Sequence, residues 1–158
     1  GPRDPEMHQT RKGKQWFFGM KMHAGVDRDT GLVHSAVVTA ANVHDKHALE
    51  KLLHGQEREV YGDTAYQGQG KTIKARAPRA RDCTNRRVHK GSAVEQLERL
   101  LNRAKSRVRA RAEHVFGVVK RLWGFAKVRY RGLAKNATRA FVALGLANIY
   151  LARKRLQA

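Results

Sequence analysis

Alternating apolar and polar positions predict a β-hairpin near the start of the chain. Over residues 15–26 an apolar side chain stands at every second position, which is the period of a strand with one buried face. Residues 27–31 have the composition of a turn, in which Gly31 suits a positive φ. Residues 32–39 are apolar and β-branched again, so the two segments are expected to pair. Residues 1–14 are polar and are interpreted as a loop or arm.

Weaker patterns predict a short helix, a short strand and an irregular insert in the middle of the chain. Asp45 is suited to cap a helix over residues 46–53. Residues 59–63 form a short apolar run that ends on a carboxylate, and this run predicts a third strand. Residues 67–91 have many cations and little apolar pattern, which indicates a basic loop or a loosely structured insert.

Apolar side chains at three- and four-residue spacing predict two long helices in the second half of the chain. The first covers residues 92–121, where an apolar stripe lies opposite a face of Arg and Lys. Ser92 and Glu95 have the spacing of a capping box at its start. The second covers residues 135–156 and ends in three cations, which the helix dipole favours. The aromatic-rich residues 123–130 between the helices are expected to be irregular.

The charge of the chain points to an anionic partner. Its 158 residues, enough for one domain, carry 33 Lys and Arg against 13 Asp and Glu, a net charge of +20. Nucleic acid is the first candidate for that partner and an anionic membrane the second. A hydrophobic content of 41% excludes a disordered basic tail. The single cysteine, Cys83, rules out an intrachain disulfide and favours an intracellular protein, and residues 1–2 have the composition of a tag remnant.

Two carboxylates are candidates for chemistry, and each has a plainer alternative. Asp63 ends the predicted third strand, where it could hold a metal or simply bond its own turn. Glu113 shares one helical face with Arg109 and Lys120, which are offset from it by about −40° and −20°. The alternative for Glu113 is an exposed salt bridge with Arg109, worth a few tenths of a kcal/mol. Position alone favours both alternatives, and neither the eight histidines nor Cys83 has zinc-finger spacing.

Several sequence blocks, in order, resemble the C-terminal catalytic part of bacterial insertion-sequence transposases of the DDE type, in the fifth insertion-sequence group. The blocks are RDPEMHQTRKGKQWFFGMKMHAGVD, GLVHSAVVTAANVHD, YGDTAYQG, RVRARAEHVFGVVKRLWGF and KVRYRGL. The resemblance runs over nearly the whole chain. It implies a mixed α/β, RNase H-like fold in residues 15–158, with a long basic helix, a C-terminal helix and a basic insert at residues 67–91.

The resemblance also implies two catalytic, metal-binding carboxylates. The family's second catalytic Asp stands in a G-D-x-x-Y context, which here makes it Asp63. Its catalytic Glu stands in the motif Y-x2-R-x3-E-x6-K, which here gives Arg109, Glu113 and Lys120, with Ser106 at the Tyr position as a departure. The implied cofactor is a pair of Mg²⁺ or Mn²⁺ ions, which prefer such hard oxygen ligands.

Double-stranded DNA, at element ends and at the target, is the implied partner, and the chain is expected to act as a homo-oligomer. No membrane or small-molecule partner is expected, and a cytoplasmic, nucleoid-associated location follows. The expected DNA-binding residues lie on the long helix and in the insert, and they are Arg107, Arg109, Arg111, Lys120, Arg121, Lys71, Lys74, Arg76, Arg79, Arg81, Arg86 and Arg87.

One family feature is missing from the chain. The first catalytic Asp of the family lies on a strand just upstream of the RDPE block, and neither Asp4 nor Asp27 matches its position. That strand is central in an RNase H-like sheet, and residues 1–14 are too polar to replace it. We therefore expect a rearranged sheet, pairing with a neighbouring chain, or a fragment of a longer protein. With one of three carboxylates absent, the chain alone is expected to be weak or inactive.

Two other classes of protein fit the charge. One is a basic DNA-binding transposase remnant or inhibitor without catalytic activity. The other is a ribosomal-type RNA binder, which does not predict Asp63 and Glu113 inside basic surroundings.

Overall fold

The predicted hairpin is confirmed. The computed structural model describes residues 3–157, so the tag remnant predicted at residues 1–2 lies outside the described residues. Strands β2 (Gln15–Val26) and β3 (Val33–Ala40) pair antiparallel, with Met20 opposite Ala40. In the turn, the Asp27 carboxylate accepts N–H bonds from Asp29 and Thr30, and Gly31 has a φ of 72°.

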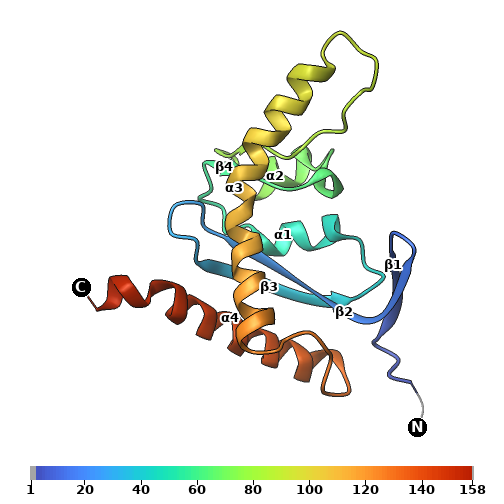
Figure 1. The fold of residues 1–158 in the computed structure, drawn as a ribbon, viewed down its shortest axis with the longest axis vertical. Coiled ribbons are helices and arrows are strands. Elements are labelled where there is room, and N and C mark those ends of the chain that lie inside the picture. The colour runs from blue at the N-terminus through green and yellow to red at the C-terminus, as the bar shows by residue number, and fades with distance from the viewer. Residues whose placement is uncertain (1–2, 158) are drawn as a thin grey trace.

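Helices cover both faces of this hairpin (Figure 1). On one face, the C-terminal half of α3 (Glu95–Leu122) and α4 (Leu133–Leu156) build a core with the sheet. Val115, Val119 and Ala147 are fully buried there, and Met22 of β2 packs against them. Lys21 and His23, at the intervening positions of β2, face the short helices η1 (Asp45–Ala48) and α1 (Leu49–Leu52). The apolar and polar positions that alternate along β2 therefore face two different layers of helices, one on each side of the sheet.

The prediction that residues 1–14 form a loop or arm is wrong for part of that segment. Strand β1 (His8–Lys12) pairs antiparallel with the first residues of β2, from Gln15 to Gly19. The turn between the strands uses Gly13 with a φ of 61°. Polar side chains suit this strand because it lies exposed at the edge of the sheet. The strand is not the buried central strand of an RNase H-like sheet.

The N-terminal segment also caps α4. The Asp4 carboxylate accepts the N–H of Gly132 at 2.6 Å, and the Glu6 carboxylate accepts the N–H of Leu133 at 2.8 Å. Helix α4 has no side-chain cap from its own flanking residue. These two carboxylates accept hydrogen bonds from two N–H groups at the start of the helix that have no partner within the helix. Their negative charges also interact favourably with the positive end of the helix dipole. This explains why α4 begins at Leu133, two residues before the predicted start.

The prediction that residues 67–91 form a basic loop or a loosely structured insert is wrong for residues 70–82, whereas residues 83–91 contain no helix or strand. They contain helix α2 (Gly70–Arg76) and strand β5 (Arg81–Asp82), which pairs parallel with β4 (Glu59–Val60). Ile73 of α2 is 1% exposed and forms a second core with Leu49 and Val60. Ile73 is the one buried residue of α2 and Val60 the one buried residue of β4, so no periodic apolar pattern arises.

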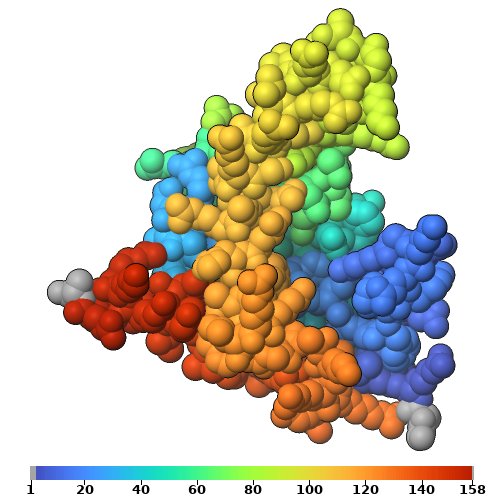
Figure 2. Space-filling view, viewed as in Figure 1, coloured from blue at the N-terminus to red at the C-terminus, as the bar shows by residue number. Residues whose placement is uncertain are grey.

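The two long helices match the predictions, but their termini do not. Val94 is the N-cap of α3 and makes no side-chain cap bond, so the predicted capping box of Ser92 and Glu95 is absent. Instead, the Glu95 carboxylate accepts the N–H of Gly91 at 2.7 Å. The N-terminal part of α3 projects away from the body with the loop that precedes it (Figures 1 and 2). In this part of α3 the residues of the predicted apolar stripe are exposed, and they are Leu97, Leu100 and Leu101.

The short elements differ from prediction in two further ways. His44, not Asp45, caps η1, because its ring nitrogen accepts the N–H of Lys46 at 3.3 Å. Strand β4 has only two residues, so the predicted strand over residues 59–63 ends before Asp63. Within the described chain, β4 pairs only with β5, and the Met20–Val26 part of β2 pairs only with β3. Both β4 and this part of β2 therefore have one side open to a further strand.

Candidate functional site

Asp63 caps a short 3-10 helix. It is the N-cap of η2 (Thr64–Tyr66), and its Oδ1 accepts the N–H of Ala65 at 2.9 Å. This is the self-bonded turn that the sequence allowed as an alternative. The carboxyl group is half-buried and stands three residues beyond β4.

Glu113 lies on α3 with its side chain 66% exposed. Its Oε1 accepts a bond from Arg109 Nη2 at 3.3 Å, so the expected i,i+4 salt bridge is present. Arg109 is the more buried partner, with 29% of its side chain exposed. A pair this exposed contributes little stability, and therefore leaves Glu113 available for another partner.

A chain of hydrogen bonds joins the segment of Asp63 to the helix face of Glu113. Asn85 donates its backbone N–H to the carbonyl of Gly62 at 2.9 Å, next to Asp63. Its side-chain amide donates to the hydroxyl of Ser106 at 3.1 Å. Ser106 and Glu113 are seven residues apart on α3, which puts them on one face and about 10 Å apart along the axis. Ser106, the one departure from the family motif, is thus a structural contact.

Asn85 itself carries an orphaned acceptor. Its Oδ1 is buried and has no hydrogen-bond partner within the described residues. The same segment is held along α3 by three more bonds: Lys105 donates to the carbonyl of Thr84, and the Asn102 side chain both accepts from the N–H of Arg86 and donates to its carbonyl. The structure therefore fixes residues 84–86 against α3, and a buried amide oxygen lies between the segments of Asp63 and Glu113. No sequence pattern pointed to Asn85, because only the fold brings it to this position.

A third carboxylate in this region is Asp45, where the sequence had indicated only a helix cap, because its charge and that of Asp63 both act on Tyr66. Asp45 pairs with Lys21 at 3.2 Å, and its Oδ1 is 3.9 Å from the ring of the buried His23. Burial lowers the pKa of His23, which also bonds the hydroxyl of Thr39. Burial and the charges of Asp45 and Asp63 raise the pKa of Tyr66 to about 12. Tyr66, the Tyr of the G-D-x-x-Y block, is therefore a neutral hydroxyl between two carboxylates.

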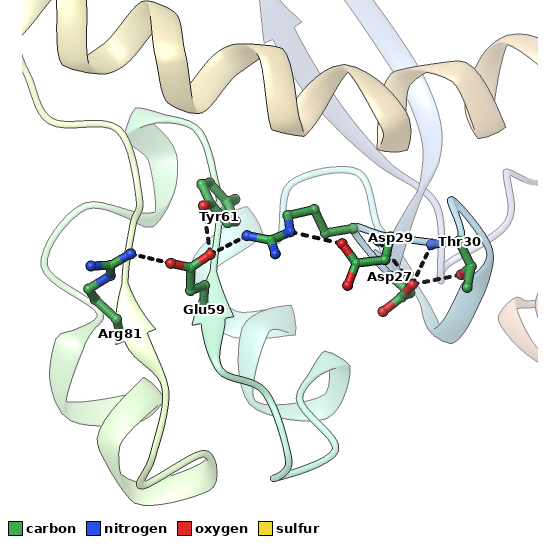
Figure 3. Close-up of polar contacts among 7 residues, drawn as sticks. Asp27, Asp29, Thr30, Glu59, Tyr61 and Arg81 are labelled. Carbon is green, nitrogen blue, oxygen red and sulfur yellow. Dashed lines mark hydrogen bonds and ion pairs between the residues drawn. The ribbon is translucent and has the colours of Figure 1, made fainter.

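A separate carboxylate, Glu59, connects the two sheets (Figure 3). It accepts a bond from Tyr61 Oη at 2.9 Å and forms ion pairs with Arg81 of β5 and Arg28 of the hairpin turn. The Tyr61 hydroxyl and the two guanidinium groups hold the pKa of Glu59 below its usual range. Arg81 thus has a structural partner, although the sequence indicated only DNA binding for it.

The donor set fits a divalent metal in chemistry but is incomplete. Carboxylate and amide oxygens are the ligands that Mg²⁺ prefers, and Asp63, Glu113 and the orphaned Asn85 Oδ1 are of this kind. However, no group of three or more His, Cys, Asp or Glu side chains in the part of the chain described is placed to hold a metal ion. The structure links the segments of Asp63 and Glu113 but does not assemble a closed site.

The cations expected to bind DNA are almost all exposed. Of the twelve, only Arg109 is half-buried. Arg76 pairs with Glu50, and Arg81 with Glu59, so these two are partly neutralised. Arg86 and Arg87 follow the buried residues 83–85 and are exposed beside α3. No helix in the described part of the chain combines the length and apolar composition needed to cross a membrane.

These observations define a strongly basic, mixed α/β protein in which Asn85 links Gly62, the neighbour of Asp63, to Ser106 on the helix that carries Glu113. The family model for the transposase DDE domain matches residues 2–149, and the chain therefore belongs to the transposase DDE domain family. A transposase function in DNA transposition follows at the level of the family, whose members generally use divalent metal ions. No solved structure matches the chain.

Proposed function

We propose that the chain is the C-terminal part of the catalytic core of an insertion-sequence transposase of the fifth group, with Asp63 and Glu113 as two of its catalytic carboxylates. The link from Gly62 through Asn85 to Ser106 carries the proposal. It joins the segments of the two motif carboxylates, which are 50 residues apart in the sequence. In this proposal residues 15–158 form the partial catalytic domain.

An RNase H-like sheet is part of the proposal. The open edge of β2 and the open edge of β4 support it, because one further strand between them would join both sheets. That strand is also where the family carries its first catalytic Asp. The Glu59 ion pairs already bridge the two sheets at one end, which is compatible with such an insertion.

The proposed site acts on a phosphodiester of DNA. Divalent metal ions, when bound by such carboxylates, activate the attacking oxygen and stabilise the leaving oxygen. Asp63 and Glu113 would hold these ions, and Glu113 would exchange its weak pair with Arg109 for a metal. Arg109 and Lys120, on the same helical face, would then contact the DNA backbone. The exposed cations of α3 and of residues 71–87 would position double-stranded DNA, and the homo-oligomeric state and nucleoid association remain predictions.

A second candidate function is a basic DNA-binding protein without catalytic activity. The described residues contain no group of three or more His, Cys, Asp or Glu side chains that could hold a metal ion, and this favours the second candidate. Both candidates predict DNA binding, so only cleavage distinguishes them.

The test is plasmid nicking by the full chain in Mg²⁺ or Mn²⁺, with Asp63→Ala, Glu113→Ala, and the control variants Asp29→Ala and Glu50→Ala. We expect weak metal-dependent nicking that both site variants abolish and neither control variant reduces. DNA binding should stay unchanged in all five proteins. Nicking that survives both site substitutions would refute the assignment. No nicking by any form, with DNA binding intact, is the result that the non-catalytic alternative predicts for this chain.

A further inference from the structure

Strands β1 and β2 form a two-stranded ribbon, residues 8–18, that projects from the sheet. Every residue in the ribbon is exposed except Thr10, which is half-buried. The ribbon leaves the body at Gly19, which is buried and has a φ of 151°. A Cβ at Gly19 would lie 3.3 Å from the Val128 side chain, so β2 packs closely there and becomes free beyond it. Figures 1 and 2 show this segment, in blue, at the side of the molecule.

The ribbon exposes large aromatic side chains that have no packing role. Trp16 is 63% exposed and Phe18 is 47% exposed. They are two residues apart on one strand and therefore lie on the same face, about 7 Å apart. Trp16 stands opposite Arg11 in the register of the two strands. Exposing so much of two such rings to water costs free energy.

Arginines accompany both rings. The guanidinium of Arg11 lies 5.8 Å from the centre of the Trp16 ring, and that of Arg3 lies 5.7 Å from the centre of Phe18. These distances are at the long end of cation–π contacts, so the rings stay accessible. The ribbon also carries Lys12 and Lys14 and contains no Asp or Glu. The nearest acids before it, Asp4 and Glu6, are engaged at the start of α4.

We propose that the Trp16–Phe18 face of the ribbon binds unpaired DNA, with bases stacked on the two rings and phosphates held by the surrounding cations. Stacking on aromatic rings combined with backbone neutralisation is how proteins bind single strands. Duplex DNA would use the cations but not the rings, because the faces of paired bases are covered. This surface does not include Asp63 or Glu113, and its test measures binding, so it stands or fails separately from cleavage.

The experiment uses the intrinsic fluorescence of Trp16. The chain has two tryptophans, so the Trp123→Phe form reports Trp16 alone. We expect a single-stranded oligonucleotide to quench this fluorescence, and the same sequence as a duplex to leave it nearly unchanged. Trp16→Ala and Phe18→Ala, made in the natural chain, should each weaken single-strand binding roughly 5- to 100-fold, as expected for the loss of one stacked base. Duplex binding should change less than about twofold.

Two further variants separate stacking from other effects. Phe141→Ala removes an aromatic side chain of the same exposure, 47%, from α4 and should leave single-strand binding unchanged. Phe18→Leu keeps an apolar side chain but not the ring, and should weaken binding as much as Phe18→Ala does. The proposal is overturned by equal losses of single-strand and duplex affinity, by full binding in Phe18→Leu, or by the absence of quenching. Far-UV circular dichroism checks that each variant is folded.

Discussion

Individual carboxylates have different roles in this chain because backbone N–H groups and cationic side chains compete to bind them. With 13 acids among 33 cations, every Asp or Glu has a choice of cationic partners. Asp63 bonds the backbone of its own turn, whereas Asp4 and Glu6 bond the start of a helix more than 120 residues away. Glu113 makes one exposed pair with Arg109, at 3.3 Å, and 66% of its side chain is exposed.

The capping role of Asp4 gives a pH-dependent prediction. The N–H bonds from Gly132 and Glu6 lower the pKa of Asp4 below its usual value of 3.8. Because the folded pKa is the lower one, this acid stabilises the folded protein above pH 3.8, and the effect is lost as the pH falls through the folded pKa. Asp4→Asn should therefore lower the Tm by several degrees at pH 7 and by much less at pH 3.

Thermal unfolding followed by circular dichroism from pH 3 to pH 7 measures this difference. Asp29→Asn is the control, because Asp29 lies in the exposed turn and pairs only with Arg28 among side chains. Its Tm should follow that of the natural chain at every pH. A Tm difference for Asp4→Asn that is equal at pH 3 and pH 7 would contradict a role for the charge.

At the scale of elements, long periodic segments could be predicted from the sequence and short ones could not. The hairpin and both long helices have a repeated apolar face that local sequence displays. Strand β1 is polar because it lies at an edge, and α2 is held mainly by Ile73. Their stability depends on contacts from distant segments, which no local pattern records. The candidate site follows the same rule, because its motifs predict Asp63 and Glu113 but not Asn85, which only the fold brings into contact with both Gly62 and Ser106.

The second core makes α2 a structural element, and this can be measured. Ile73→Ala should lower the free energy of unfolding by about 2–5 kcal/mol, because Ile73 is 1% exposed and packs with Leu49 and Val60. The matched control, Ile149→Ala, changes a residue that is 60% exposed on α4 and should cost less than about 0.5 kcal/mol. Urea unfolding gives both values. Equal costs would mean that residues 67–91 are as loosely held as their sequence pattern indicated.

At the scale of the whole molecule, the net charge of +20 must be balanced by a partner. The exposed cations are distributed over α3, residues 71–87, the ribbon and the end of α4. Such a field attracts any polyanion, so affinity for DNA alone does not identify a binding surface. At a defined DNA-binding surface, particular cations contact phosphates and release their counterions. Cations of equal charge elsewhere on the protein do not.

The salt dependence of duplex binding tests whether the proposed surface is localised. Each phosphate contact contributes about 0.9 to the slope of log affinity against log salt concentration. Replacing Arg86 and Arg87 by Gln together should therefore reduce that slope by about 1.8. Replacing Lys51 and Lys154 by Gln removes the same net charge from exposed positions on α1 and α4 and should leave the slope nearly unchanged. If both double variants lower the slope equally, DNA is bound by the overall field of the protein, and residues 71–87 have no special part in it.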